Sequence, residues 1–383
     1  MADIRGKKRV FISDIHMGTE ESVQGVGDLR PWGWLGPGRA RKLGDFLDRV
    51  EQDASIGELI ILGDLFDDWI IPSQLDPEPG AIFRKIATAS QNGPIISALS
   101  RIAEGSQKLV YVNGNHDMLF GPEDMEAALG TDRFEFIRTS PGIGVYEADG
   151  IVAEHGNAYC LFNAPDPNSC EGHCLPLGYF ISRAVAHRAA TRGEELDVTD
   201  VLAEFIDTYK QSSEVARAVY NAVLEYAGPE SGAYLMNGVD RYSGTMAAVS
   251  VSNTFGDIYG RWNSVKPGNV RAPISLLDDA GVLQPAADRI YYKNTAAKIV
   301  LFGHTHRATM LPSPNLEPGR TSDRTCEFIY ANTGTWIGGK PTHYVETILD
   351  EDSGRHDVRL MRFKKLAFGF EDSLVMQRHV YLD

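Results

Sequence analysis

The chain has 383 residues, of which 43% are hydrophobic, and a formal net charge of -15. This length suits one large domain or two ordinary ones, and the apolar fraction excludes a disordered chain. The acidic balance argues against an extended nucleic-acid footprint, because phosphate backbones are bound mainly through Lys and Arg. No window of about eighteen apolar residues is present, so we expect no transmembrane segment.

The first residues and the cysteine content together favour a reducing, cytoplasmic setting. The apolar stretch that follows the basic residues Lys7, Lys8 and Arg9 is too short for the apolar region of a signal peptide. Four cysteines in a chain of this length do not make a disulfide framework.

Five short apolar runs, each closed by a turn that contains Gly or Asp, predict buried β-strands. Their length and their Ile and Val content favour strands over helices. In chain order these runs are 9–13, 59–62, 109–112, 151–153 and 299–302. Between the first two, helical spacing is followed by Leu43, Phe46, Leu47 and Val50. The succession of strand, helix and strand indicates an α/β fold.

The middle of the chain, roughly 161–295, differs in character and is predicted to be an inserted, largely helical segment. From about Asp197 to Ala227, two apolar stripes follow the helical period, and the good helix formers Ala and Glu are plentiful. The segment either stabilises the fold or forms a lid over a substrate. A lid is favoured because motifs with candidate ligands lie immediately on both sides of it.

After the insertion the chain is β-rich again. The apolar runs 344–349 and 358–363 flank Glu351-Asp352-Ser353-Gly354, which predicts a hairpin turn. We therefore expect a main domain made of residues 1–160 and 296–383, interrupted by the helical insertion.

Each of the five predicted strands ends in residue types that bind metal ions. In chain order these endings are Asp14-x-His16, Gly63-Asp64-x-x-Asp67, Gly114-Asn115-His116-Asp117, His155-Gly156 and Gly303-His304-x-His306. Imidazole and carboxylate are natural ligands of zinc, manganese and iron. Extended backbone would put both side chains of an Asp-x-His or His-x-His pair on one side. Because the carboxyl ends of strands form the usual crevice of α/β sheets, the five endings predict one metal centre.

This ordered set of motifs resembles the calcineurin-like metallophosphoesterases, over roughly residues 9–160 and 296–340. Asn332-Thr333-Gly334-Thr335-Trp336 also resembles the strand and turn that follow the last motif in that family. The resemblance implies an α/β (α+β) fold with two packed β-sheets flanked by helices. The strand pattern alone predicts an open, doubly wound sheet instead.

The resemblance also implies two divalent metal ions, with Mn, Fe and Zn as candidates. The implied ligands of one ion are Asp14, His16, Asp64 and His306. The implied ligands of the other are Asp64, Asn115, His155 and His304, so that Asp64 bridges the pair. Spacing alone does not say which ligand holds which ion.

The expected activity is hydrolysis of a phosphomonoester or phosphodiester by a hydroxide that bridges the two ions. Two cations clamp both oxygens of an in-line displacement and lower the pKa of bound water. His116 suits the acid that protonates the leaving group, since its unperturbed pKa lies near the operating pH. Asp117 is expected to orient His116, and Asp67 to support the site from outside the ligand set.

The expected substrate is a small phosphorylated molecule, because the superfamily fold does not fix it further. A first alternative is a UDP-2,3-diacylglucosamine-type pyrophosphohydrolase, a subgroup with a helical insertion at the same place and an Arg where Arg307 stands. That subgroup usually has Arg in place of His116 and a shorter insertion, so a generic phosphoesterase is preferred. An alternative of another class is a non-catalytic scaffold, as in the retromer coat. Such chains tend to lose ligands that this sequence retains.

Two further groups of residues have open roles. Cys170, His173 and Cys174, with Cys160 as a fourth ligand, could bind a separate zinc, but free thiols are preferred because only three ligands are local. Three tryptophans near the motif loops either line the substrate pocket or are simply buried, namely Trp32, Trp34 and Trp69. The native metals and the oligomeric state are not determined by the sequence.

Overall fold

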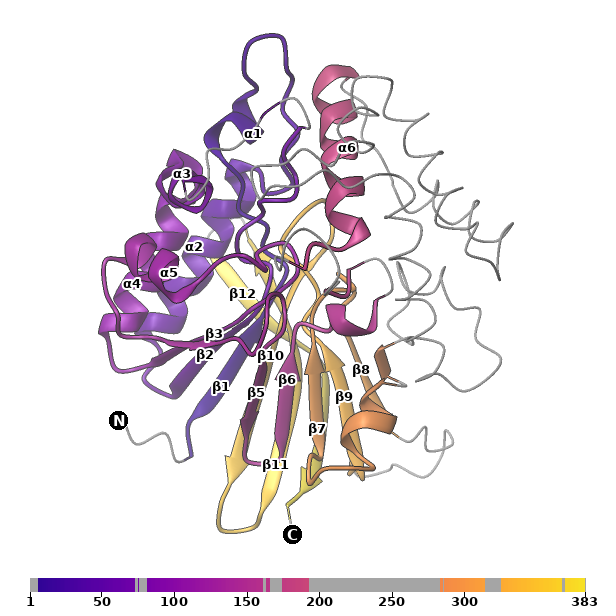
Figure 1. Ribbon diagram of the computed structural model, residues 1–383. Coiled ribbons are helices and arrows are strands. Elements are labelled where there is room, and N and C mark those ends of the chain that lie inside the picture. The colour runs from indigo at the N-terminus through magenta and orange to yellow at the C-terminus, as the bar shows by residue number, and fades with distance from the viewer. Residues whose placement is uncertain are drawn as a thin grey trace, which may run out of the picture.

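The computed structural model describes residues 6–72, 75, 81–160, 163–165, 174–192, 283–284, 286–313, 325–366 and 369–382. In these residues two β-sheets face each other, and helices cover the outer face of one of them (Figure 1). Within the same ranges, no helix combines the length and the apolar character needed to cross a lipid bilayer.

The larger sheet has the strand order β12-β11-β10-β1-β2-β3-β4. Its parallel part consists of β1 (Lys8–Ile12), β2 (Ile56–Leu62), β3 (Lys108–Val112) and β4 (Glu135–Ile137). An antiparallel part pairs with β1 and consists of β10 (Thr342–Asp350), β11 (Arg355–Lys365) and β12 (Phe370–Tyr381). The motifs that follow β1, β2 and β3 therefore all leave the sheet at one edge.

The smaller sheet has the strand order β5-β6-β7-β9-β8. Its strands are β5 (Val145–Ala148), β6 (Ile151–Glu154), β7 (Ile299–Phe302), β8 (Thr309–Ser313) and β9 (Phe328–Asn332). Parallel pairing joins β6 to β7 and β7 to β9, so the segments after these three strands also share an edge. The pairing of β6 with β7 joins parts of the chain on either side of the predicted insertion.

Helices account for the remaining regular structure. They are α1 (Glu20–Gln24), α2 (Pro37–Gln52), α3 (Ile82–Thr88), α4 (Gly93–Glu104), α5 (Pro122–Leu129) and α6 (Leu177–Arg192), with the short elements η1 (Ser90–Asn92), η2 (Asn157–Tyr159) and η4 (Ala287–Tyr291). The helix α2 begins at Pro37, whose fixed φ suits a first helical position. It buries the four apolar residues that predicted it, including Phe46, against the larger sheet.

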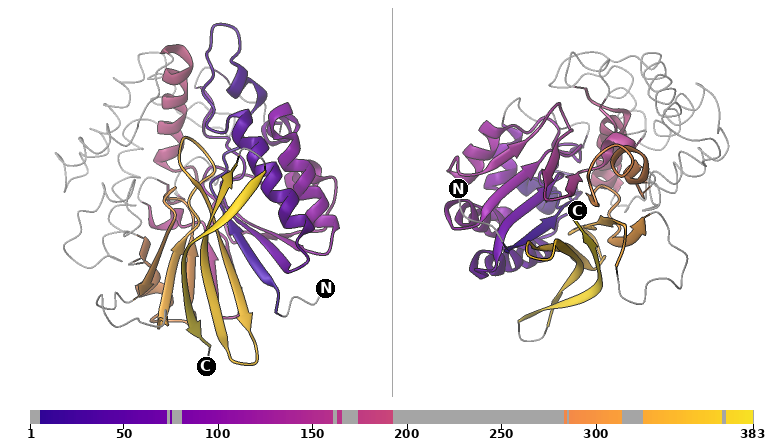
Figure 2. Two further views of the ribbon diagram at one scale, coloured as in Figure 1. Left: turned by 180° about the vertical axis from the view of Figure 1, so that it is seen from behind. Right: turned by 90° about the horizontal axis from the view of Figure 1, so that it is seen from below.

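Three apolar layers hold these elements together. One lies between the larger sheet and the helices α2 to α5, and a second lies between the two sheets, with Phe11, Leu62 and Leu301 in it. A third covers the outer face of the smaller sheet, where Tyr291 and Phe302 pack together. Figure 2 shows the two sheets from behind and from below, with α2 to α5 and α6 on opposite sides. Burial of both faces explains why the parallel strands are continuous apolar runs.

The five predicted strands and the predicted hairpin are confirmed, the hairpin turn lying between β10 and β11. The open, doubly wound sheet predicted from the strand pattern is wrong, because the strands divide between two sheets. The two packed sheets implied by the resemblance are confirmed. Of the predicted insertion, the structure describes α6, η4 and a few adjoining residues, and the stripes between 197 and 227 lie outside the described residues.

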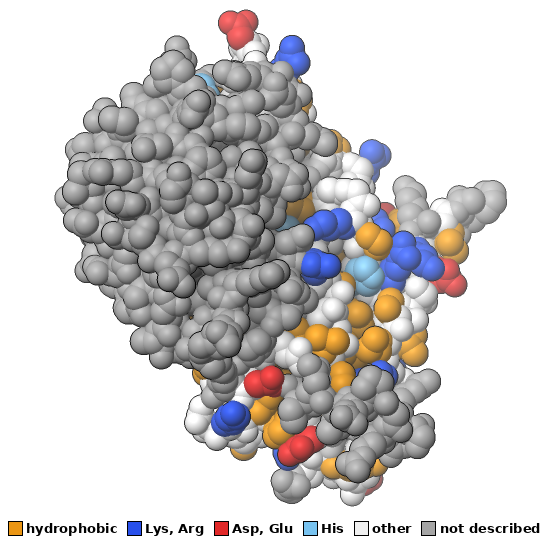
Figure 3. All heavy atoms as spheres, turned by 90° about the vertical axis from the view of Figure 1, so that its right-hand side faces the viewer, with side chains coloured by type: hydrophobic (Ala, Val, Ile, Leu, Met, Phe, Trp, Pro, Cys, Tyr) orange, Lys and Arg blue, Asp and Glu red, His pale blue; other side chains and the backbone are white. Residues whose placement is uncertain are grey.

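Basic side chains gather locally although the chain is acidic. Figure 3 shows several Lys and Arg side chains close together on one part of the face that it draws. On the larger sheet, burial lowers the pKa of His343, and the charges of Arg362 and Lys42 lower it further. Basic residues are therefore not spread evenly over the surface of this acidic chain.

A buried ion-pair network joins the two sheets at the end where β1 and β2 begin. The Nε of Arg9 donates to Glu58 Oε2 at 2.6 Å, and its Nη2 donates to Asp149 Oδ2 at 2.5 Å. The hydroxyl of Tyr146 donates to the same Glu58 oxygen at 2.7 Å. The side chains of Arg9 and Glu58 are 8% and 2% exposed, so neither can exchange its partner for water.

Replacing Arg9 by Ala should lower the free energy of unfolding by ~3 kcal/mol, because it leaves the buried Glu58 carboxylate short of its main partner. The matched control is Arg101→Ala, which removes the pair with Asp48 in which both side chains are more than 40% exposed. That control should cost less than ~1 kcal/mol. Urea unfolding followed by circular dichroism measures both, and equal losses would contradict the prediction.

Candidate metal centre

The side chains predicted to bind metal meet where the carboxyl edges of the two sheets adjoin. Their residues lie on the loops after β1, β2, β3, β6 and β7. A first cluster brings together ligand atoms of Asp14, His16 and His306, all within 4.8 Å of one another. A second cluster does the same with Asp64, His155 and His304. Segments 290 residues apart in sequence, at Asp14 and His304, are joined directly by hydrogen bonds.

The backbone at these positions is left-handed, a conformation that side chains other than glycine rarely adopt. Five residues of the two clusters have φ between 54° and 67°, namely Asp14, His16, Asp64, His304 and His306. The expectation that the Asp-x-His and His-x-His pairs share one side of an extended strand is therefore wrong. Each such residue costs about 1–3 kcal/mol and persists only where the surrounding structure enforces it, as at functional sites.

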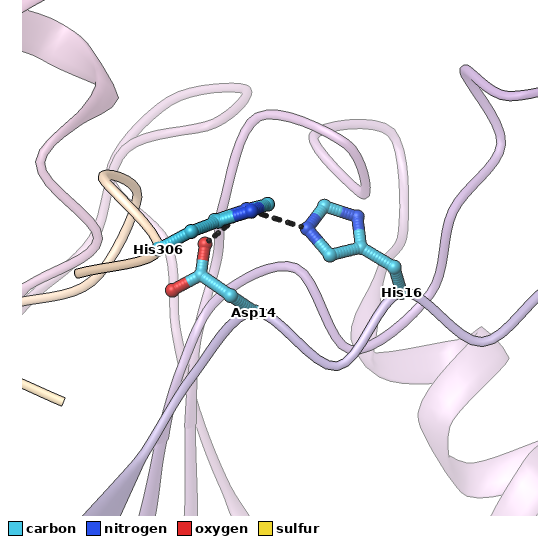
Figure 4. Close-up of side chains that lie close together, drawn as sticks. All are labelled: Asp14, His16 and His306. Carbon is cyan, nitrogen blue, oxygen red and sulfur yellow. Dashed lines mark hydrogen bonds and ion pairs between the residues drawn. The ribbon is translucent and has the colours of Figure 1, made fainter. Parts of the chain in front are cut away.

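The first cluster is drawn in Figure 4. The Nε2 atoms of His16 and His306 lie 3.1 Å apart, and His306 Nε2 lies 3.2 Å from Asp14 Oδ1. On its other side, His16 Nδ1 faces Asp67 Oδ2 at 3.0 Å, which places the ring hydrogen there. His16 Nε2 then presents a lone pair toward the cluster. Either the Nε2 hydrogen of His306 or a bound cation can join these three atoms.

In the second cluster, acceptor atoms face both ring nitrogens of His155. His155 Nδ1 donates to the carbonyl of Leu62 at 2.7 Å, and a carbonyl can only accept. His155 Nε2 faces Asn115 Oδ1 at 2.9 Å and Asp64 Oδ2 at 3.1 Å, which are also acceptors. Burial alone would lower the pKa of His155, but the charges of Asp64 and Asp14 raise it to about 10. A proton thus occupies a place that a cation would fill.

The donor set of the second cluster fits a divalent cation. His304 completes it, with Nδ1 3.3 Å from His155 Nε2. The amide oxygen of Asn115 faces the cluster. Its Nδ2 is buried and has no hydrogen-bond partner among the described residues. Imidazole nitrogen with carboxylate and amide oxygen is a combination that suits manganese, iron and zinc.

Asp64 reaches both clusters. Its Oδ2 lies 3.1 Å from His155 Nε2 and 3.7 Å from His16 Nε2. Its Oδ1 accepts the backbone N–H of His116 at 2.9 Å. Burial would raise the pKa of this carboxyl, but the positive charges of His155 and His116 hold it well below its usual value. The carboxylate therefore stays ionised between the two groups of histidines.

Glycine is required where the loops after β2 and β3 touch. A Cβ on Gly114 would lie 2.3 Å from Asp64 Oδ1 and 2.5 Å from its backbone nitrogen. A Cβ on Gly63 would lie 2.6 Å from the Cα of Gly114, and Gly63 itself has a φ of +75°. These two residues allow the carboxylate of Asp64 to approach the second cluster.

His116 is oriented by Asp67 rather than by the expected Asp117. Its Nδ1 lies 2.9 Å from Asp67 Oδ1, which also accepts the backbone N–H groups of Trp69 at 3.1 Å and Ile70 at 3.0 Å. Burial would lower the pKa of His116, yet the charges of Asp67 and Asp64 raise it to about 9. His116 is 8% exposed, and since its Nδ1 contacts Asp67, Nε2 is the ring nitrogen that is not used in this hydrogen bond.

Asp117 instead ties the loops together. Its Oδ2 accepts the backbone N–H of Leu65 at 2.8 Å and the hydroxyl of Tyr111, and its Oδ1 accepts the N–H of Gly114 at 3.0 Å. Burial, and then the charge of Asp64, raises the pKa of this carboxyl to about 7. The predicted role of Asp117 in orienting His116 is wrong, because all of these contacts lead to other groups.

The end of β9 and the segment after it form hydrogen bonds to the loops that carry both clusters. The sequence did not reveal this role. Asn332 Nδ2 donates to the Gly303 carbonyl at 2.5 Å. The Asp14 carbonyl accepts Thr335 Oγ1 at 2.8 Å and the N–H of Trp336 at 3.1 Å. The only signal was the likeness of Asn332–Trp336 to a family segment, which indicates proximity but no contact.

Three side chains from outside the motifs also border the centre or lie near it. Trp34 lies edge-on to His16, with ring centroids 4.9 Å apart. Asn163 Nδ2 lies 3.4 Å from His304 Nε2 and donates to the sulfur of Cys160 at 3.3 Å. Cys170 and His173 of the predicted zinc alternative lie outside the described residues, so the zinc site and the preferred free thiols both stay predictions.

Replacing Gly114 by Ala should weaken manganese binding by about 10-fold or more, as displaced supporting contacts typically do. The added methyl group would push Asp64 out of its place between the clusters. Gly93→Ala is the control, because a Cβ there meets no atom within 4 Å. Titration calorimetry with Mn²⁺ measures the affinity, and circular dichroism checks the fold. Unchanged affinity in Gly114→Ala would contradict the geometry described above.

Comparison with known proteins identifies the family. A model of the calcineurin-like phosphoesterases matches residues 7–194, and no curated protein gives a significant match. Solved structures similar to this chain include Vps29 from Chaetomium thermophilum, with a TM-score of 0.35 and 6% identity over 98% of this chain and 100% of that chain. A single mutant of Vps29 from Entamoeba histolytica has a TM-score of 0.29 and 9% identity over 96% and 98% of the two chains.

The calcineurin-like phosphoesterase YfkN from Bacillus subtilis has a TM-score of 0.29 and 12% identity over 97% of this chain and 89% of that chain. All three TM-scores are low, so the family assignment depends on the matched residues and not on these structures. The matched region contains the motifs from Asp14 to His155, and the structure brings His304 and His306 to them. The part of the chain that carries these motifs, residues 7–194, belongs to the calcineurin-like phosphoesterase family.

Proposed function

We propose that this protein is a metal-dependent phosphoesterase that hydrolyses a small phosphomonoester or phosphodiester with two divalent ions. The observation that carries the proposal is the second cluster, where His155 Nε2 faces two acceptor oxygens and has its hydrogen fixed on the opposite nitrogen. A first cluster of the same chemistry shares the carboxylate Asp64 with it. Two such clusters with one common carboxylate suit a pair of ions.

The chain would hold one ion with Asp14, His16, Asp64 and His306, and the other with Asp64, Asn115, His155 and His304. When bound, the two ions supply Lewis acidity, an activated water and charge neutralisation at phosphorus. Hydrogen bonds with Leu62, Asp67 and Thr335 hold His155, His16 and Asp14 without an ion, which supports this assignment. Such preorganisation is the main way in which a protein assists reactions that develop charge.

His116 would handle the proton of the leaving group. In the reaction a water oxygen bonds to phosphorus, the bond from phosphorus to the leaving oxygen breaks, and that oxygen takes the proton from His116 Nε2. The Nδ1 side of the ring stays on Asp67 throughout, which offsets the positive charge of the protonated ring. The attacking water gives its own proton to solvent, and His116 Nε2 takes a proton back from solvent before the next turnover.

The reaction class can be tested with bis-p-nitrophenyl phosphate and p-nitrophenyl phosphate in the presence of Mn²⁺, Fe²⁺ or Zn²⁺. We expect p-nitrophenol release that stops on adding EDTA and returns on adding metal back. Failure with every ion would favour the scaffold alternative. UDP-diacylglucosamine serves as a parallel substrate, and UMP release at a much higher kcat/KM would favour the pyrophosphohydrolase.

Two substitutions separate metal binding from proton transfer. Asp64→Ala should lower metal content and abolish turnover, because it removes the carboxylate shared by the clusters. His116→Ala should retain the metals and slow turnover by about 10²–10⁴-fold, the usual contribution of a general acid. Elemental analysis and initial rates measure these outcomes, with the exposed Asp132→Ala as control. Full activity of His116→Ala would rule out its proposed role.

A further inference from the structure

The ring plane of His116 is not fixed by its hydrogen bond to Asp67 alone. One bond from Nδ1 leaves the imidazole free to tilt about the line joining the two atoms, and a tilt would redirect Nε2. Trp69 covers the ring with its centroid 4.5 Å away and a plane angle of 30°. From other directions, His16 meets the ring edge-on at 4.6 Å and Trp34 lies at 5.5 Å. The indole of Trp69 is the closest and most nearly parallel of the three.

Trp69 is itself held in place on two sides. Its backbone N–H is bonded to Asp67 Oδ1, the same oxygen that accepts from His116. Its ring meets Tyr179 of α6 edge-on, with centroids 5.9 Å apart. The side chain is fully buried, yet its Nε1 has no partner among the described residues. An unpaired buried N–H costs about 1–3 kcal/mol, which packing alone would avoid with Phe.

The helix α6 is attached to the loop that carries Trp69. Arg183 of α6 donates from Nη2 to the Leu75 carbonyl at 2.8 Å and from Nε to the Ile71 carbonyl at 3.4 Å. Its guanidinium also lies over the ring of Tyr179, 5.9 Å from the centroid. In addition, Ile70 packs in one apolar cluster with residues of α6. Any displacement of α6 would therefore be passed on to Trp69.

We infer that Trp69 is a positioning residue, which holds the imidazole plane of His116 so that Nε2 points toward the leaving oxygen, and that α6 holds Trp69. This inference depends on the proposed function. A residue with this role affects the proton-transfer step and leaves metal binding unchanged.

The test compares Trp69→Leu with Trp69→Phe, which keeps an aromatic face. Trp32→Leu is the matched control, because Trp32 is a buried tryptophan that packs with α6 residues and donates from Nε1 to the Ile70 carbonyl at 3.1 Å. Phenyl and 2,4-dinitrophenyl esters of the phosphate class that the wild type cleaves are the substrates. The dinitrophenolate leaves without a proton, whereas the phenolate benefits from one.

In Trp69→Leu we expect kcat for the phenyl ester to fall by about 10-fold or more, with KM and metal content unchanged and the dinitrophenyl ester affected by less than about 3-fold. Trp69→Phe should recover most of the loss, and Trp32→Leu should show no such selectivity. Equal losses on both esters, or the same selectivity in Trp32→Leu, would overturn the inference. Absence of turnover in the wild type would instead reject the proposed function itself.

A second measurement does not depend on activity. In the metal-free protein, NMR of the His116 carbon-bound protons, assigned with His116→Ala, should show an upfield ring-current shift. The shift should be lost in Trp69→Leu, be largely kept in Trp69→Phe and persist in Trp32→Leu. A Tyr179→Leu variant should show a smaller change of the same sign. Unaltered His116 signals in Trp69→Leu would show that the indole does not pack on the ring.

Discussion

The structure of the centre depends on one buried charge, the carboxylate of Asp64. A carboxylate that is 1% exposed must be compensated by positive charge or hydrogen-bond donors, because desolvation is otherwise too costly. The nearest groups are histidine nitrogens from both clusters and a single backbone N–H. Several features follow from packing histidines and backbone so closely around this carboxylate. They are the glycines beside it, the left-handed backbone of the candidate ligands and the raised pKa of His155.

The division into two sheets is what makes this concentration possible. The larger sheet provides the loops of Asp14, Asp64 and Asn115, and the smaller sheet provides those of His155 and His304. The apolar layer between the sheets, with Phe11 and Leu301 in it, keeps their carboxyl edges together. Strained backbone at the ligands is tolerated because the strands that precede them are buried on both faces and do not yield.

The sequence predicted the strands and brought forward the candidate ligands because both have local signals, namely Ile- and Val-rich runs and His or Asp directly after them. It did not predict that β6 pairs with β7 in a separate sheet, since partner choice depends on contacts across the whole chain. The sequence also did not show which carboxylate orients His116. Asp117 is adjacent in sequence, but its side chain turns toward Leu65 and Tyr111, whereas Asp67 reaches His116 from another loop.

The late position of β7 in the chain governs when the centre can form during synthesis. A nascent polypeptide released from the ribosome only as far as the loop after β6 already contains Asp14, His16, Asp64 and His155. It lacks the two histidines that complete the clusters, because these follow β7. A partly made chain thus has incomplete clusters, and an ion that needs the full set of candidate ligands could be held only after the distal strands have emerged and β7 has paired with β6.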